Sequence, residues 1–123
     1  MITSEEFLTF CDSAFEEWAG VLAELGDDLV SVRPDVPGAN TAFGLTAHIG
    51  GVIDFWGRTT NRGMVVPRDR PAEFLATGTV AQALALLDQG RAHLHEDVAA
   101  ADVSAAPANP SRTTWASVVK PGS

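Results

Sequence analysis

The chain has 123 residues, enough for one compact domain and too few for two domains with separate hydrophobic cores. Sixteen acidic residues against eight Lys and Arg give a formal net charge of −8, which disfavours binding to nucleic acids and to anionic membrane surfaces. A single cysteine, the lack of any uninterrupted apolar stretch of about eighteen residues, and the lack of a secretory signal together predict a soluble protein of the reducing cytoplasm.

The first predicted helix begins at a capping box, in which Thr3 and Glu6 can each bond the other's backbone amide. Apolar residues then recur at alternating steps of four and three, and most acidic residues fall off this stripe, so one face is expected to pack against a core. Gly26 is the predicted end of the helix. The stripe comprises Phe7, Cys11, Ala14, Trp18, Val21 and Leu25, with Leu8, Phe15 and Leu22 beside it.

Two prolines close together predict a loop over residues 27–40, after which Asn40 and Thr41 can cap a second helix that runs to about Asn61. Its apolar positions are Phe43, Leu45, Ile49, Val52, Ile53, Phe55 and Trp56. Four glycines each weaken this helix by about 1 kcal/mol relative to Ala. These glycines are Gly44, Gly50, Gly51 and Gly57. They suggest the close approach of a neighbouring backbone or of a bound molecule, although packing alone also explains them.

Residues 62–77 contain prolines and little periodicity, which predicts a long irregular connection. A third helix is predicted from the capping-box pair Thr79 and Gln82 to about Ala101. One face of this helix carries Val80, Leu84, Leu87, Leu94 and Val98.

Together these elements predict an all-α protein with a helical bundle domain over residues 1–102 and an irregular tail, rich in Ala, Ser and Pro, over residues 103–123. Apolar stripes this wide suit a four-helix bundle, but the pattern encodes only three long helices. We therefore expect the fourth helix of such a bundle to be missing.

His48 follows Leu45 by three positions and precedes Val52 by four, so its imidazole is predicted on the inward face of the second helix, near Phe55 and Trp56. A core histidine that bonds a backbone carbonyl or another side chain is the commoner outcome of such a position. The alternative is a metal ligand. A catalytic metal site normally has three protein ligands, so one histidine does not make such a site.

The other two histidines, His93 and His95, lie roughly 200° apart around a helix and so cannot chelate one ion together. We expect them at the boundary between core and solvent, with a pH-dependent charge as their only effect. Cys11 is interpreted as core filler, because no cationic neighbour is evident that would stabilise its thiolate.

Basic residues are concentrated in one part of the chain and could hold an anionic substrate group through charge-assisted hydrogen bonds. A solvated loop paired with nearby acids is the commoner outcome. The residues are Arg58, Arg62, Arg68 and Arg70, with Asp69 among them. Trp18 and Trp56 are most simply core aromatics, although Trp56 could also form a wall of a pocket near His48.

Glycine-rich phosphate loops, Cys-x-x-Cys pairs, nucleophile elbows and His-Glu-x-x-His motifs do not occur, so those functional classes are excluded.

Four segments carry a resemblance to a known family: residues 25–29, 33–41, 45–57 and 67–74, the third of which contains Leu-Thr-Ala-His-Ile-Gly-Gly. They resemble the DinB/YfiT-like superfamily, and within it the branch of mycothiol-dependent maleylpyruvate isomerase and related mycothiol transferases. The likeness covers about residues 1–101, and its most specific part is Asn40-Thr41 followed eight positions later by His48.

The resemblance implies an up-down four-helix bundle that holds a divalent metal ion, usually zinc, through one histidine of the second helix and a His-x-x-x-His pair of the last helix. His48 matches the first ligand, and no later residue matches the pair. The resemblance also implies mycothiol as thiol cosubstrate and an electrophilic substrate, with Trp56 and Arg58 of the second helix expected at the cofactor.

Two functional hypotheses follow. The first is a thiol transferase or isomerase of this family, shortened after the third helix, in which His48 alone retains a ligand position and any metal binding needs ligands from another chain. The second is a non-catalytic helical module that forms a homodimer through its uncovered apolar face, because a large apolar patch seldom stays exposed in a soluble monomer.

Overall fold

The computed structural model describes residues 2–101, which form α-helices and one π-helical segment and contain no β-strand. The all-α class predicted from the sequence is therefore confirmed. The elements are α1 (Ser4–Val30), α2 (Ala42–Asp54), the π-helix η1 (Phe55–Asn61) that continues α2, α3 (Arg70–Leu75) and α4 (Val80–Ala100). The predicted tail over residues 103–123 lies outside the described residues.

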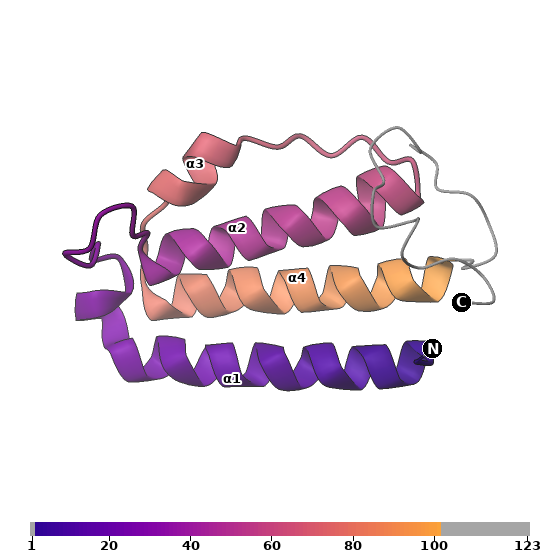
Figure 1. Cartoon of the computed structure of the whole chain (residues 1–123), viewed down its shortest axis with the longest axis horizontal. Helices are drawn as coiled ribbons and strands as arrows, with labels where there is room; N and C mark the ends of the chain where they lie inside the picture. The colour runs from indigo at the N-terminus through magenta and orange to yellow at the C-terminus, as the bar shows by residue number, and fades with distance from the viewer. Residues whose placement is uncertain (1, 102–123) are drawn as a thin grey trace.

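Three long helices lie side by side, with α4 between α1 and α2 (Figure 1). The helices α2 and α4 run in the same direction, because the connection between them returns along the outer side of α2 and contains α3 (Figure 1). Long crossover connections of this kind occur in helical bundles. The helices α1 and α2 make few direct contacts, so α1 is held chiefly by α4.

The capping box predicted for the first helix is present. The Thr3 hydroxyl accepts from the Glu6 amide at 3.0 Å, and the Glu6 carboxylate accepts from the Thr3 amide at 3.2 Å. The helical backbone is interrupted at Gly26, where the sequence predicts the helix to end, although the element continues for one more turn to Val30. Gly26 adopts φ 72°, which glycine reaches at little cost, and so kinks the helix, after which a further turn buries Val30 completely.

The apolar stripe predicted on the first helix is only partly buried. Phe15 and Leu22 belong to the core, and Cys11 and Trp18 pack against it. Other members of the stripe, Phe7, Ala14 and Val21, are exposed. The reason is that α1 packs mainly against one neighbour, α4, which covers only one edge of a wide apolar face.

The second helix begins as predicted, with Thr41 as its N-cap accepting from the Gly44 amide at 2.9 Å. Its helical course ends near Asn61 as predicted, but the last turns form a π-helix. π-Helical turns are rare and occur frequently at functional sites.

The predicted irregular connection contains one element that the sequence pattern did not reveal, the short helix α3. Asp69 caps it by accepting from the Ala72 amide at 3.1 Å. Pro71 lies in its first turn, where a backbone N–H has no acceptor within the helix, so the missing N–H of proline costs no hydrogen bond. The helix α4 begins at the predicted capping box of Thr79 and Gln82 and ends at Ala100.

The core lies where α1, α2 and α4 meet. Its most deeply buried apolar side chains are Phe15, Leu22, Val30, Phe43, Ala83 and Leu87. None of the helices within residues 2–101 has the length and apolar character that a membrane crossing requires.

Candidate functional site

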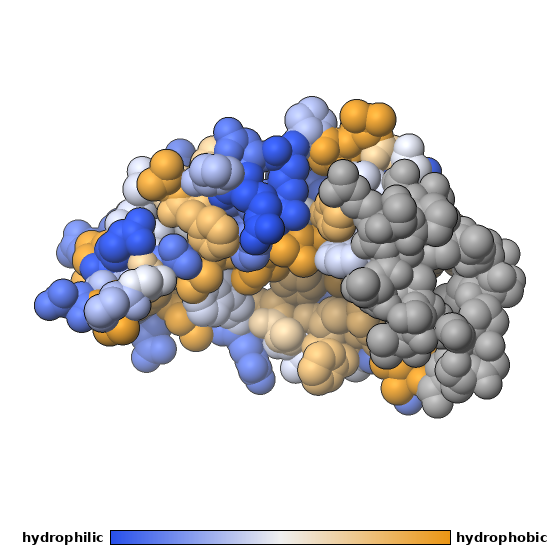
Figure 2. Space-filling view, turned by 45° about the horizontal axis from the view of Figure 1, so that its top comes forward, coloured by the Kyte–Doolittle hydropathy of each residue, from blue (hydrophilic) through white to orange (hydrophobic). Residues whose placement is uncertain are grey.

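A cavity of about 240 Å³ opens between α2, α4 and the segment that leads into α3. Glycines at positions 50, 51 and 90, together with Ala47, leave its floor almost free of side chains. Its walls combine apolar groups with ionisable ones, of which the latter are Asp54, Arg68, Asp69, Glu73 and His93. Strongly hydrophilic residues also gather on the surface over the segment that leads into α3, beside apolar ones (Figure 2). We call this space the α2–α4 cavity.

His48 lies next to the cavity and faces α3, not the interior between the long helices as predicted. Its ring stacks on Phe74 with 4.5 Å between centroids, and its side chain is 24% exposed. Its Nδ1 is 3.1 Å from Oε1 of Glu73. Because a carboxylate can only accept, Nδ1 carries the hydrogen, which leaves the lone pair of the neutral ring on Nε2.

Glu73 is held from two sides. Arg68 donates from Nε to Oε2 at 3.0 Å and from Nη2 to Oε1 at 3.2 Å, in addition to the bond from His48. Burial acts to raise the pKa of Glu73, but the hydrogen bonds and charges of Arg68 and His48 outweigh it, so this pKa lies below its ordinary value. Glu73 is therefore an ionised anchor that orients the imidazole.

The lowered pKa of Glu73 predicts a loss of stability in acid. A carboxyl group with a lower pKa in the folded state binds fewer protons than in the unfolded chain, so its stabilisation is complete above its ordinary pKa of about 4.3 and is lost as the pH falls through the folded value. We expect the free energy of unfolding of Glu73→Gln to fall less steeply between about pH 5 and pH 3 than that of the wild type.

Urea unfolding at several pH values measures this slope. Glu17→Gln, which removes an exposed carboxylate of α1, is the control and should keep the wild-type slope. Equal slopes for the wild type and Glu73→Gln would show that Glu73 does not couple folding to pH.

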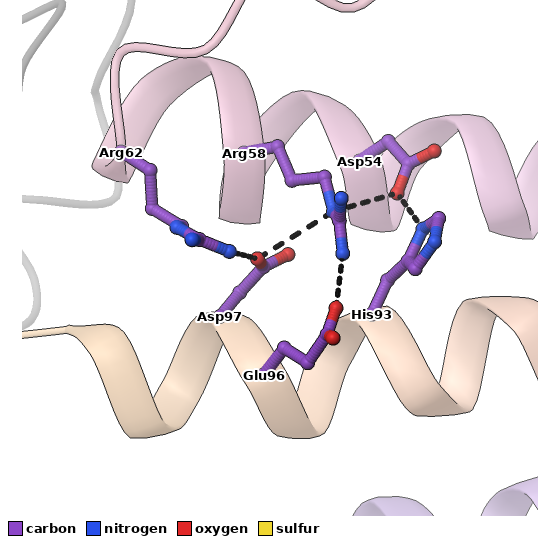
Figure 3. A network of polar contacts seen from close by, with 6 residues as sticks. All are labelled: Asp54, Arg58, Arg62, His93, Glu96 and Asp97. Atoms are coloured by element: carbon purple, nitrogen blue, oxygen red, sulfur yellow. Dashed lines mark hydrogen bonds and ion pairs between the residues drawn. The ribbon is translucent and has the colours of Figure 1, made fainter.

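A second polar network joins α2 and η1 to α4 (Figure 3). Asp97 of α4 is only 2% exposed, and its Oδ1 accepts from Arg62 at 2.9 Å and lies 3.6 Å from Nε of Arg58. Arg58 also pairs with Glu96 of α4 and, at 3.9 Å, with Asp54. Among residues 2–101, no hydrogen-bond partner is present for Oδ2 of Asp97, Nε of Arg58 or Oγ1 of the buried Thr60.

The histidines of α4 lie at the boundary of the core, as expected, and each one binds a carboxylate of another helix. Nδ1 of His93 is 2.7 Å from Oδ1 of Asp54 in α2, and Nε2 of His95 is 2.8 Å from Oδ1 of Asp12 in α1. The pKa of Asp12 lies below its ordinary value, and the hydrogen bond from His95 is the largest cause.

Cys11 fits its interpretation as core filler. Burial and, to a smaller extent, the charge of Asp12 raise the pKa of its thiol, which disfavours the reactive thiolate.

Comparison with known proteins adds the family. The chain matches the sequence profile of the DinB superfamily over residues 12–119. It belongs to the DinB superfamily. Searches of curated proteins and of solved structures found no significant match.

The metal site that the resemblance to DinB proteins implies is not complete in the described chain. His48 offers Nε2, and a carboxylate on the other ring nitrogen is the usual arrangement around a metal-ligating histidine. Within residues 2–101, however, no three His, Cys, Asp or Glu side chains are placed to hold one ion. Over residues 102–123, the sequence contains one residue of these types, Asp102. The residues present therefore do not fit a zinc ion with three protein ligands.

Neither of the two residues expected at a DinB cofactor lines the cavity. Trp56 packs edge-on against Phe55 with 5.1 Å between ring centroids. Arg58 is engaged by carboxylates of α2 and α4. The basic residues predicted as one cluster belong to two separate networks. Arg58 and Arg62 form ion pairs with Asp97, whereas Arg68 forms an ion pair with Glu73.

Sequence reasoning missed the carboxylates that organise these sites, namely Asp54, Glu73 and Asp97. In the sequence, only the glycines of the second helix indicate that other groups approach it closely. A Cβ at Gly51 would meet the Glu73 carboxylate, and a Cβ at Gly57 would lie 2.9 Å from Cγ of Asp97. A Cβ at Gly44 would lie 3.0 Å from the backbone oxygen of Phe74, while a Cβ at Gly50 would meet no atom within 4 Å.

Proposed function

We propose that this chain is a thiol-binding DinB protein of the transferase or isomerase type, with its small-molecule ligand in the α2–α4 cavity. The observation that carries the proposal is the cavity itself, which has a glycine floor and walls that combine apolar side chains with five ionisable ones and with the polar Thr46, Thr59 and Gln89. Binding sites for small molecules generally have this composition. Mycothiol as the thiol and an electrophile as the second substrate follow from the resemblance to one branch of the superfamily.

The proposal assigns His48 to a metal site that two chains share. Its support is the pairing of Nδ1 with Glu73, which leaves Nε2 free to bind an ion, and the match of this position to the first ligand of the resembling branch. Because the described residues supply no second and third ligand, these come from another chain. Zinc is the proposed metal, since imidazole is among its usual ligands.

Metal analysis of the purified protein tests this assignment. We expect zinc to copurify with the wild type, to be lost in His48→Ala, and to be retained in the matched control His95→Ala, whose histidine pairs with Asp12 across the bundle. Light scattering on the same samples should show a dimer for the zinc-loaded wild type. Zinc that survives in His48→Ala, or a zinc-loaded monomer, would contradict the shared site.

A second candidate function is self-association without catalysis. The observation that favours it is an exposed apolar stripe on α1, where Phe7, Phe10 and Val21 are 37%, 74% and 41% exposed and lie on one face. This stripe would bury itself against a second copy of the chain. A dimer that contains no metal in either the wild type or His48→Ala would support this function over the first.

A further inference from the structure

We propose that Asp54 and His93 form a proton-accepting dyad that takes the proton from a small acidic thiol bound in the α2–α4 cavity. The inference rests on the proposed function, because it requires a small molecule in that cavity. It gives the site a route to a nucleophile that uses the described residues alone. Two side chains from two helices, α2 and α4, carry it.

The geometry fixes which nitrogen of His93 accepts the proton. Oδ1 of Asp54 lies 2.7 Å from Nδ1 of His93, and a carboxylate can only accept, so the hydrogen is on Nδ1 and the lone pair is on Nε2. Both side chains are about three-quarters buried, with exposed fractions of 23% for Asp54 and 22% for His93. Both line the cavity. No described residue forms a hydrogen bond with Nε2 of His93.

Glycines of the same two helices leave the space beside the dyad. Gly50 precedes Asp54 by four residues and Gly90 precedes His93 by three, so each glycine lies on the helix face of its dyad residue. A Cβ on Gly90 would stand 3.8 Å from the Cα of Gly50, which shows how closely the helices approach. A ligand on this floor lies within one helical turn of the imidazole.

Charged groups from both helices and from the cavity wall surround the dyad. Asp54 contacts His93 directly, and Arg58 pairs with both Asp54 and Glu96. Asp69 and Glu73 lie on the cavity wall with Arg68 as the opposing cation. Arg68 bonds Glu73 through Nε and Nη2, and its Nη1 makes no hydrogen bond to a described residue. A carboxylate on the ligand could accept a charge-assisted hydrogen bond from Nη1 of Arg68.

Acidity selects a thiol as the donor. The ordinary pKa of a thiol is about 8.5 and that of imidazole about 6.5, so the equilibrium constant for proton transfer between them is about 0.01. Such a transfer is accessible to a general base, whereas an alcohol is far too weak an acid. In the transfer the S–H bond breaks, the electron pair stays on sulfur, and an N–H bond forms at Nε2. The products are a thiolate and an imidazolium that the Asp54 carboxylate stabilises, and no oxidant or reductant is needed.

The test uses N-acetylcysteine, which carries both a thiol and a carboxylate, and iodoacetamide as the electrophile. The thiolate displaces iodide as the S–C bond forms, and the alkylated small molecule is separated from protein and quantified. We expect the full-length protein to accelerate this reaction at least about tenfold near pH 6.5. His93→Gln and Asp54→Asn should abolish the acceleration, while His95→Gln, whose histidine does not line the cavity, should retain it.

Binding is measured separately, through the amide NMR signals of the floor glycines on addition of N-acetylcysteine, and circular dichroism checks that each variant is folded. Shifts at Gly50, Gly51 and Gly90 with acceleration only when the dyad is intact support the inference. Shifts without acceleration, or acceleration that survives in folded His93→Gln, overturn the dyad and leave the binding function in place. No shifts in the wild type overturn the proposed function, and the dyad with it.

Discussion

Asp97→Ala should lower the free energy of unfolding by about 3 kcal/mol, because removing one member of a buried ion pair leaves its partner without compensation. Asp97 is 2% exposed and accepts from Arg62 at 2.9 Å, with Arg58 close by. Urea unfolding at neutral pH measures the change. The loss should appear as a lower denaturation midpoint with an unchanged slope.

Asp88→Ala is the matched control, since it removes an exposed aspartate from the same helix. Its effect should stay within about 0.5 kcal/mol, as is usual for surface substitutions. Equal effects of the two substitutions would mean that the network between η1 and α4 contributes nothing to stability. In that case the buried carboxylate would need another explanation.

Gly57→Ala should destabilise the protein by about 2 kcal/mol although alanine is the better helix former, because the new Cβ has no space. It would lie 2.9 Å from Cγ and 3.0 Å from Cβ of Asp97. The second of these atoms is fixed to the backbone of α4 and cannot swing away. The substitution must therefore push η1 and α4 apart or break the Asp97 contacts.

Gly20→Ala provides the opposite case on the same scaffold. Gly20 lies inside α1 and is exposed, and a Cβ there would meet no atom within 4 Å. The substitution should stabilise the protein by about 1 kcal/mol, the ordinary difference between glycine and alanine in a helix. Stabilisation by both substitutions, measured by thermal or urea unfolding, would contradict the close approach of η1 and α4.

Much of the secondary structure could be predicted, because its determinants are local. The capping boxes at Thr3 and Thr79 and the cap at Thr41 place three helix starts correctly, and apolar periodicity gives their approximate lengths. The short helix α3 was missed, since six residues are too few for a periodic pattern and its cap, Asp69, stood in a basic cluster. Gly26 predicts a helix end, and the structure has a kink there followed by one more turn, because glycine permits both outcomes.

The candidate site could be predicted only in part. His48 was singled out as the histidine of the second helix, but its partner Glu73 is 25 residues away in an element that the pattern did not reveal. His93 was expected only to change charge with pH, and the structure places it on a cavity wall against Asp54, 39 residues distant. The resemblance implies Trp56 and Arg58 at a cofactor, and neither residue lines the cavity.

The sequence by itself determined an all-α chain, its three long helices and the residues that begin them, because a helix is specified by caps and by spacing within a few turns. Only the tertiary structure decided which carboxylate each histidine binds and where a cavity remains. Such pairs depend on how helices approach one another, and that approach is set by the absence of side chains at positions such as Gly51 and Gly57 as much as by the residues present.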